Sequence, residues 1–110
     1  MTVHEKALVT VLACQALFAL IALPLALRKV KPNPVYGFRT RSTLGDEALW
    51  YEVNARFGGV QLVASALGAV AAFLLFRPGF LPAAAVIPAS LVVLVVPAAV
   101  AGLAAAARLR

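Results

Sequence analysis

Charged side chains are scarce in this chain, and three long stretches contain none. Of the 110 residues, 10 are Lys or Arg and 4 are Asp or Glu. Residues 7–27, 57–76 and 78–107 hold no charged side chain and no histidine. Pumps, proton-coupled transporters and ion pathways usually carry a titratable group within the membrane. Its absence argues against these classes, including multidrug exporters with a membrane-buried carboxylate.

Cysteine and histidine each occur once, as Cys14 and His4. A single cysteine cannot form an internal disulfide, so it assigns no redox compartment. The sequence also lacks a cluster of metal ligands, a nucleophile paired with a base, and a glycine-rich phosphate loop. Asp46 and Glu47 are explained as residues at the start of a helix. We therefore expect a protein that is not an enzyme and that binds no metal or cofactor.

Hydrophobic residues, in contrast, make up 64% of the chain, and its mean hydropathy is +0.98. A small water-soluble domain has too little interior to bury such a fraction. A bilayer core about 30 Å thick requires about 20 apolar residues as a helix. The sequence therefore predicts an all-α membrane protein, a single domain over 1–110, with transmembrane helices at about 7–27, 57–76 and 83–106. The first stretch ends in basic residues rather than a cleavage site, so we expect it to be retained.

The basic residues divide unevenly between the two sides of a three-span arrangement. Lys6 and Arg77 fall on one side. The other side holds Arg28, Lys29, Lys31, Arg39, Arg41, Arg56, Arg108 and Arg110. Because Lys and Arg near span ends are retained in the cytoplasm, we predict a multi-pass plasma-membrane protein with its N-terminus outside and with the loop 28–56 and the C-terminus inside. The predicted partner of this loop is the anionic headgroups of the bilayer, and not nucleic acid.

The loop 28–56 combines turn signals with the start of a helix. Pro32 and Pro34 force the chain to be extended or turned, and Gly37 offers a position for positive φ. The spacing from Thr43 to Asp46 predicts an N-cap and a helix from about residue 46.

That helix is predicted to be short, amphipathic and interfacial. One apolar stripe follows helical spacing: Leu49, Trp50, Val53 and Phe57. Glu52 and Arg56 are spaced for an i,i+4 ion pair, and Trp50 suits the headgroup level. We expect this helix to turn into the second span at Gly58–Gly59.

Small residues recur every four positions in the second and third spans. The rows are Ala64, Gly68 and Ala72, and Ala98, Gly102 and Ala106. Such rows let helices approach closely, although an Ala-rich composition also produces them by chance. In the first span, Gln15 is expected to face another helix that offers a hydrogen-bond partner. Pro88 and Pro97 are expected to kink the third span or mark its ends.

Two interpretations of the loop remain open. In the first, its arginines only orient the protein in the membrane. In the second, the loop is a folded recognition element in which Trp50 and Asn54 lie one turn apart, and Arg39 and Arg41 pair with Glu47 or with acids of a partner. The second is favoured, because retention of the loop requires only Lys and Arg, and the loop also carries Pro, Gly, Trp and Asn at set places.

The loop resembles the signature of the SdpI family of membrane proteins. The resemblance covers about 29–68 and rests on Asn33-Pro-Val-Tyr-Gly-Phe-Arg-Thr, followed by Trp50, Asn54 and Gly58. In that family, an Asn-x-x-(Tyr/Phe)-Gly-(Ile/Phe)-Arg-Thr stretch precedes a helix that enters a membrane span. The motif or partner-binding positions carried over are Asn33, Tyr36, Gly37, Arg39, Thr40, Trp50, Asn54 and Gly58.

The resemblance implies an integral membrane immunity protein. The founding member protects a bacterium from its own secreted killing peptide, and it holds a transcriptional repressor at the membrane when the toxin is present. We therefore expect resistance to a membrane-active peptide, with a peptide toxin, a cytoplasmic repressor or further copies of the chain as partners. Longer members have an additional N-terminal membrane region; we expect this protein, with three spans, to lack it, which bears on the repressor-tethering role. The alternative function is a small accessory or structural subunit of a larger membrane complex, for which the small-residue rows are the evidence.

Overall fold

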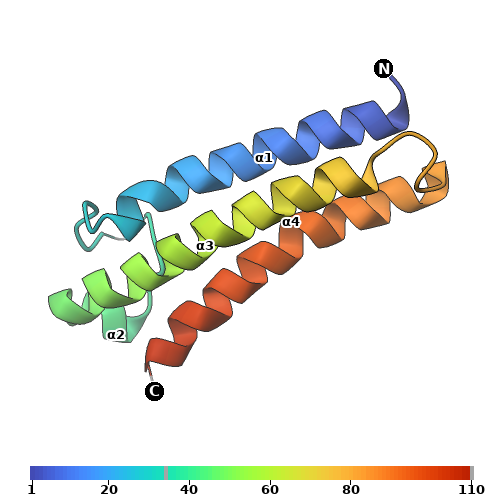
Figure 1. Cartoon of the computed structure of the whole chain (residues 1–110). Helices are drawn as coiled ribbons and strands as arrows, with labels where there is room; N and C mark the ends of the chain where they lie inside the picture. The colour runs from blue at the N-terminus through green and yellow to red at the C-terminus, as the bar shows by residue number, and fades with distance from the viewer. Residues whose placement is uncertain (34, 110) are drawn as a thin grey trace.

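The structure, a computed structural model, describes residues 1–33 and 35–109, and over these it is all-α (Figure 1). The elements are α1 (Val3–Ala26), α2 (Arg41–Leu44), α3 (Glu47–Leu75), α4 (Ala83–Ala106) and a 3-10 turn, η1 (Ala107–Leu109). α1 and α4 run opposite to α3, which packs along both of them. The predicted all-α class with three long helices is confirmed.

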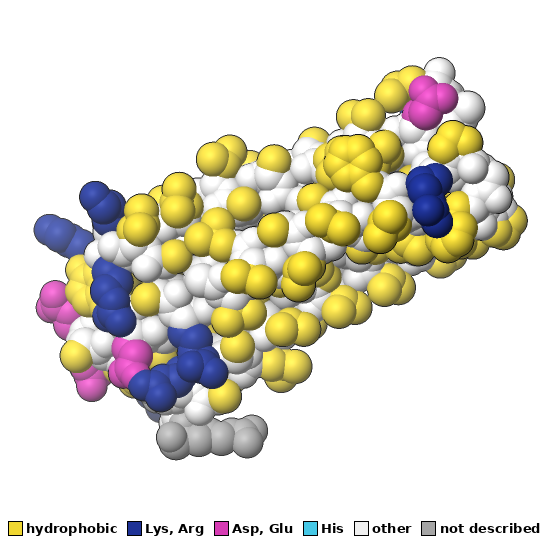
Figure 2. Space-filling view, viewed as in Figure 1, with side chains coloured by type: hydrophobic (Ala, Val, Ile, Leu, Met, Phe, Trp, Pro, Cys, Tyr) yellow, Lys and Arg dark blue, Asp and Glu magenta, His cyan; other side chains and the backbone are white. Residues whose placement is uncertain are grey.

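Each long helix is long and apolar enough to cross a bilayer. α3, with 29 residues, is about 44 Å long at the helical rise, against about 30 Å for the hydrocarbon core. Large aliphatic side chains face outward, among them Leu20, Leu67 and Leu103, which are 68%, 65% and 72% exposed. Figure 2 shows hydrophobic side chains along the bundle and charged ones near its two ends. Such a surface is suited to hydrocarbon and not to water.

α1 ends in a Schellman arrangement that turns the chain into the loop. The N–H of Arg28 donates to the carbonyl of Leu25 at 3.2 Å, and the N–H of Lys29 donates to that of Pro24 at 2.9 Å. Arg28 has a φ of 59°, a left-handed conformation that glycine usually supplies at this position. The loop therefore leaves α1 at a fixed angle.

Two caps begin the helices after the loop, and they differ from the prediction. Thr40 Oγ1 accepts the N–H of Thr43 at 3.1 Å, and Thr43 Oγ1 accepts the N–H of Thr40 at 2.8 Å. This capping box begins α2, so the prediction of Thr43 as an N-cap is wrong. Asp46 is the N-cap of α3 and accepts the N–H of Leu49 at 3.1 Å. Thr43 was misassigned because a hydroxyl can serve either end of a capping box.

α3 continues without a break through Gly58 and Gly59, so the predicted turn at these glycines is wrong. The segment predicted as an interfacial helix forms the first turns of α3. Gly58 instead serves packing, because a Cβ there would lie 2.6 Å from both the carbonyl oxygen of Ala22 and the nitrogen of Ala26. The backbones of α1 and α3 touch at this crossing, as small residues allow in membrane helices.

The predicted ion pair between Glu52 and Arg56 is also wrong. Glu52 pairs with Arg108, and Arg56 Nε donates to the carbonyl of Ala104 at 2.9 Å. The last carbonyls of a helix lack donors within it, and Arg56 supplies one to α4. The two contacts join the first turns of α3 to the C-terminal end of α4 and to η1.

The small-residue rows have different outcomes on the two helices. On α3, Gly68 and Ala72 are buried and Ala64 is half-buried. On α4, the buried residues are Val86, Val93, Ala101 and Ala105. The predicted row on α4 is therefore not the packed face: Ala98 is exposed, and a Cβ at Gly102 would meet no neighbouring atom within 4 Å.

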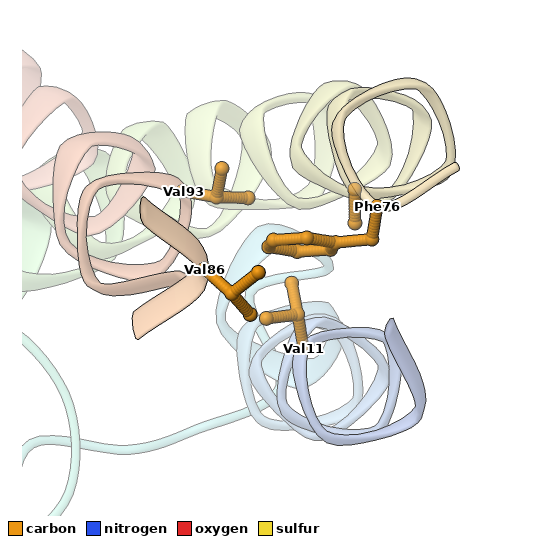
Figure 3. Close-up of a cluster of buried hydrophobic side chains, with 5 residues drawn as sticks. Val11, Phe76, Val86 and Val93 are labelled. Atoms are coloured by element: carbon orange, nitrogen blue, oxygen red, sulfur yellow. The ribbon is translucent and has the colours of Figure 1, made fainter. Parts of the chain in front are cut away.

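A hydrophobic cluster joins the three long helices toward the end opposite the loop (Figure 3). Its buried members are Val11, Ala72, Phe76, Val86 and Val93. Beside the cluster, Gln15 is 3% exposed, and its Nε2 donates to the carbonyl of Val93 at 3.0 Å. Gln15 therefore faces another helix, as predicted. Pro88 and Pro97 lie inside α4 and do not mark its ends.

Candidate functional site

Asn33 shapes the start of the loop between α1 and α2. Its Oδ1 accepts the N–H of Val35 at 3.0 Å and that of Tyr36 at 2.6 Å, while its Nδ2 donates to the carbonyl of Lys31 at 2.8 Å. An Asn side chain that bonds to the following backbone closes an Asx-turn. In this structure Asn33 therefore acts on the shape of the loop.

Tyr36 ties the loop to α1. Its hydroxyl donates to the carbonyl of Ile21. Burial raises the pKa of the Tyr36 phenol, which favours the protonated form that donates this bond. The Tyr36 N–H also donates to Asn33 Oδ1, so these two motif residues are in direct contact.

Asn54 of α3 holds the middle of the loop. Its Oδ1 accepts the N–H of Phe38, and its Nδ2 donates to the carbonyls of Phe38 at 3.2 Å and Trp50 at 3.0 Å. Gly37 permits this approach: its φ is 109°, and a Cβ there would lie 2.7 Å from Asn54 Oδ1. Only glycine adopts that φ without strain. The structure thus brings Gly37 and Asn54 together, and one buried amide satisfies both backbone groups of Phe38.

Trp50 fills the space beneath the loop. It is completely buried, and its Nε1 donates to the carbonyl of Val30 at 2.8 Å. The edge of its ring lies 3.3 Å from the place that a Cβ of Gly37 would occupy. Trp50 and Asn54 lie one turn apart, as predicted, but both side chains are turned into the protein. They hold the loop and are not presented at the surface.

Thr43 and Phe38 belong to this junction, although sequence reasoning did not assign them a place in the site. Thr43 is completely buried, and its Oγ1 donates to the carbonyl of Phe38 at 3.2 Å, in addition to its role in the capping box with Thr40. The Phe38 ring packs against Phe57 of α3, with ring centroids 6.1 Å apart. The Thr-x-x-Thr spacing was the signal that could have revealed the box.

Arg39 lies on the outer side of the junction. Its side chain is exposed, as are Val35 at 80% and Leu44 at 48%. Gly58, the remaining motif position, lies apart from the junction at the crossing of α1 and α3. The motif residues therefore divide into an inner set that fixes the loop, one glycine that packs helices, and Arg39 on the surface.

The electrostatic setting of the junction is basic. On the face that Figure 2 shows, most Lys and Arg side chains gather at the end that carries α2. Arg28, Lys29 and Lys31 are exposed there. Over the described residues, no group of three or more His, Cys, Asp or Glu is placed to hold a metal ion. The inner polar side chains are engaged with backbone groups, so the arrangement presents a shaped, positively charged loop at one end of the bundle.

The comparisons bear on this motif directly. A model of the SdpI/YfhL protein family matches residues 29–106, a range that holds every motif position together with α2, α3 and α4. No curated protein and no solved structure matches the chain. The matched range covers well over half of the chain and extends past the loop into both following spans. With three helices able to span a bilayer, the chain is a multi-pass membrane protein that belongs to the SdpI/YfhL protein family.

Proposed function

We propose that this protein gives resistance to a membrane-active peptide toxin. The observation that carries the proposal is the family match over 29–106, which includes the whole motif. The mechanism is binding without enzymatic catalysis. The protein engages either the toxin within the bilayer or a cytoplasmic partner at the loop, and it acts as a monomer or as a homo-oligomer. The loop end, which carries most of the basic residues, is the cytoplasmic end in this proposal.

The outer surface of the loop is the part that supports recognition of a partner. Trp50, Asn54 and Thr43 are buried, so their contribution to binding is to position the loop. Val35 and Leu44 are exposed apolar side chains, and Arg39 is an exposed cation between them in the sequence. An apolar and cationic surface of this kind suits an acidic or amphipathic partner.

A survival assay tests the proposal. A strain that lacks the gene is challenged with a panel of membrane-active peptides, and the gene is returned as wild type, Arg39→Ala or Val35→Asp. The deletion is expected to raise sensitivity to at least one peptide, and the wild-type gene to restore resistance. Each variant is expected to restore less resistance at equal abundance on immunoblots. Unchanged sensitivity of the deletion strain to every peptide would contradict the immunity role.

A second candidate function, an accessory subunit of a larger membrane complex, is favoured by one observation. Ala98 is exposed, and a Cβ at Gly102 would meet no described atom within 4 Å. Small residues on a lipid-facing helix allow a partner helix to approach closely. Gentle detergent extraction followed by crosslinking separates the two functions. A stoichiometric large partner supports the subunit role, whereas a monomer or homo-oligomer supports immunity.

A further inference from the structure

A continuous apolar groove runs along α3 and α4 on the lipid-facing side. It consists of two adjoining hollows of about 360 and 580 Å³, and both are lined by Ala64, Leu67 and Val100. The inner hollow reaches Ala71 on α3 and Val92 on α4, and the outer one ends at Arg56. From Arg56 to Ala71 the groove follows 15 residues of helix, or about 22 Å, which spans the thickness of one leaflet of the hydrocarbon core, about 15 Å.

Arg56 lies at the mouth of this groove, and within residues 1–33 and 35–109 no carboxylate is paired with it. Its neighbour one turn away, Glu52, is paired with Arg108. Among the described residues, the Arg56 guanidinium donates one hydrogen bond, from Nε to the carbonyl of Ala104. This bond anchors the Nε side of the guanidinium to α4, and the side chain of Arg56 is exposed. An Arg anchored in this way is set to bind a phosphate.

The chemistry of the groove changes sharply along its length. Beyond Arg56, each lining residue is apolar: Val, Leu, Ala, Gly or Pro. Val63 and Leu67 are 62% and 65% exposed along its edge. Gly59 leaves the outer hollow open, because a Cβ there would meet no neighbouring atom within 4 Å. One charged end and one extended apolar path match the shape of an anionic lipid.

We propose that this groove binds an anionic phospholipid of the leaflet on the loop side, with its phosphate on Arg56 and one acyl chain between α3 and α4. Basic sites between membrane helices on the cytoplasmic side bind anionic headgroups in this manner. A partner helix is the less suitable occupant. Four lining residues are small (Gly59, Ala64, Gly68 and Ala71), but bulky ones lie among them, such as Val63, Leu67 and Val100. Close helix association uses faces made mainly of small or hydrogen-bonding residues. The inference does not depend on the immunity function, since it concerns the membrane setting alone.

Native mass spectrometry tests the proposal by measuring which lipids the purified protein retains in a neutral detergent. The probes are phosphatidylglycerol and phosphatidylcholine with the same acyl chains, with inorganic phosphate as a headgroup control. The wild type is expected to retain phosphatidylglycerol about fivefold better than phosphatidylcholine, the preference that one Arg near an anionic surface provides. Arg56→Gln should remove this preference, whereas Arg77→Gln, at the other end of the bundle, should keep it. Inorganic phosphate should not displace the lipid.

A second pair of variants tests the groove without changing charge. Gly59→Leu fills the outer hollow and should lower retention of phosphatidylglycerol. Gly102→Leu adds the same side chain at an equally open position outside the groove and should have no effect. Equal retention of the two lipids by the wild type would overturn the proposal, as would undiminished retention in Gly59→Leu. In a Cys14→Ala background, a disulfide-linked dimer formed by Gly59→Cys in native membranes would assign the groove to a second copy of the chain instead.

Discussion

Gln15 of α1 donates through Nε2 to the main-chain carbonyl of Val93 on α4, with 3.0 Å between the nitrogen and the oxygen. This carbonyl needs an outside donor because the residue four positions later is Pro97, which has no N–H. Gly68 of α3 leaves the space through which the Gln15 amide passes. A side chain on one helix thus satisfies a backbone group that a proline leaves unpaired in another, the usual way in which membrane proteins accommodate proline.

A double-mutant cycle tests this relationship. Gln15→Met removes the donor and keeps an unbranched side chain. With Pro97 present, Gln15→Met leaves the carbonyl of Val93 unpaired. In Pro97→Ala, the N–H of residue 97 can donate to that carbonyl instead. We expect a coupling free energy of about 1 kcal/mol between the two substitutions, within the range for hydrogen bonds between membrane helices. The measurement is the free energy of unfolding of the four proteins in mixed micelles.

The coupling is more informative than either single variant. The Oε1 of Gln15 is buried and has no hydrogen-bond partner in the part of the chain that the structure describes, so its removal offsets part of the loss in Gln15→Met. Gln61 provides the control, since its Nε2 donates to Ser65 Oγ on its own helix at 2.8 Å. Gln61→Met should show no coupling to Pro97→Ala. Additive effects of Gln15→Met and Pro97→Ala would show that the hydrogen bond contributes nothing.

Adjacent glycines in α3 should respond in opposite ways to alanine. At Gly58 a Cβ would lie 2.6 Å from backbone atoms of α1, and at Gly59 it would meet none within 4 Å. Gly58→Ala should therefore separate the helices and cost about 1–3 kcal/mol, as overpacking does. Gly59→Ala should be neutral or stabilising by up to about 1 kcal/mol from helix propensity. Abundance in membranes and unfolding in micelles measure both, and equal effects would contradict the close crossing.

The three long helices could be predicted from the sequence because hydrophobic length is a local property. The uncharged stretches locate each helix. The Lys and Arg residues of the loop mark the end of the bundle at which charge is concentrated. The ion pair of Glu52 could not be predicted in the same way. The i,i+4 neighbour Arg56 is a plausible partner on one helix, and only the fold brings Arg108 within reach. The same limit applies to Gly58–Gly59. A sequence does not distinguish a glycine that breaks a helix from one that allows two helices to pack closely.

The residues of the candidate site could be predicted better than their roles. The motif positions Asn33, Gly37, Trp50 and Asn54 do converge on one loop. The burial of Trp50 and Asn54 could not be deduced, because an apolar stripe beside the membrane fits either an exposed surface or a buried contact. Both side chains are turned inward by hydrogen bonds to the backbone: to the carbonyl of Val30, and to the carbonyl and N–H of Phe38. Side-chain patterns in a sequence do not reveal such backbone partners.

Removal of the Asn54 amide should loosen the loop. Asn54→Ala leaves both backbone groups of Phe38 without that partner, at a cost of about 1–3 kcal/mol for buried polar groups. Trypsin should then cleave at Arg39 and Arg41 about tenfold faster in the solubilised protein, because cleavage follows local opening. Val35→Ala, at a side chain that is 80% exposed, is the control and should be cleaved at the wild-type rate. Cleavage of Asn54→Ala at that same rate would show that the amide does not hold the loop.

The orientation in the membrane can be measured with single cysteines at the two ends of the bundle. In a Cys14→Ala background, Val35→Cys places a thiol at a side chain that is 80% exposed in the loop, and Phe80→Cys places one at a side chain that is 52% exposed between α3 and α4. Because most Lys and Arg lie at the loop end, positive charge should keep that end in the cytoplasm. A membrane-impermeant maleimide should therefore label Phe80→Cys in intact cells and Val35→Cys only after lysis. Labelling of Val35→Cys in intact cells, with protection of Phe80→Cys, would reverse the orientation and place the motif junction outside.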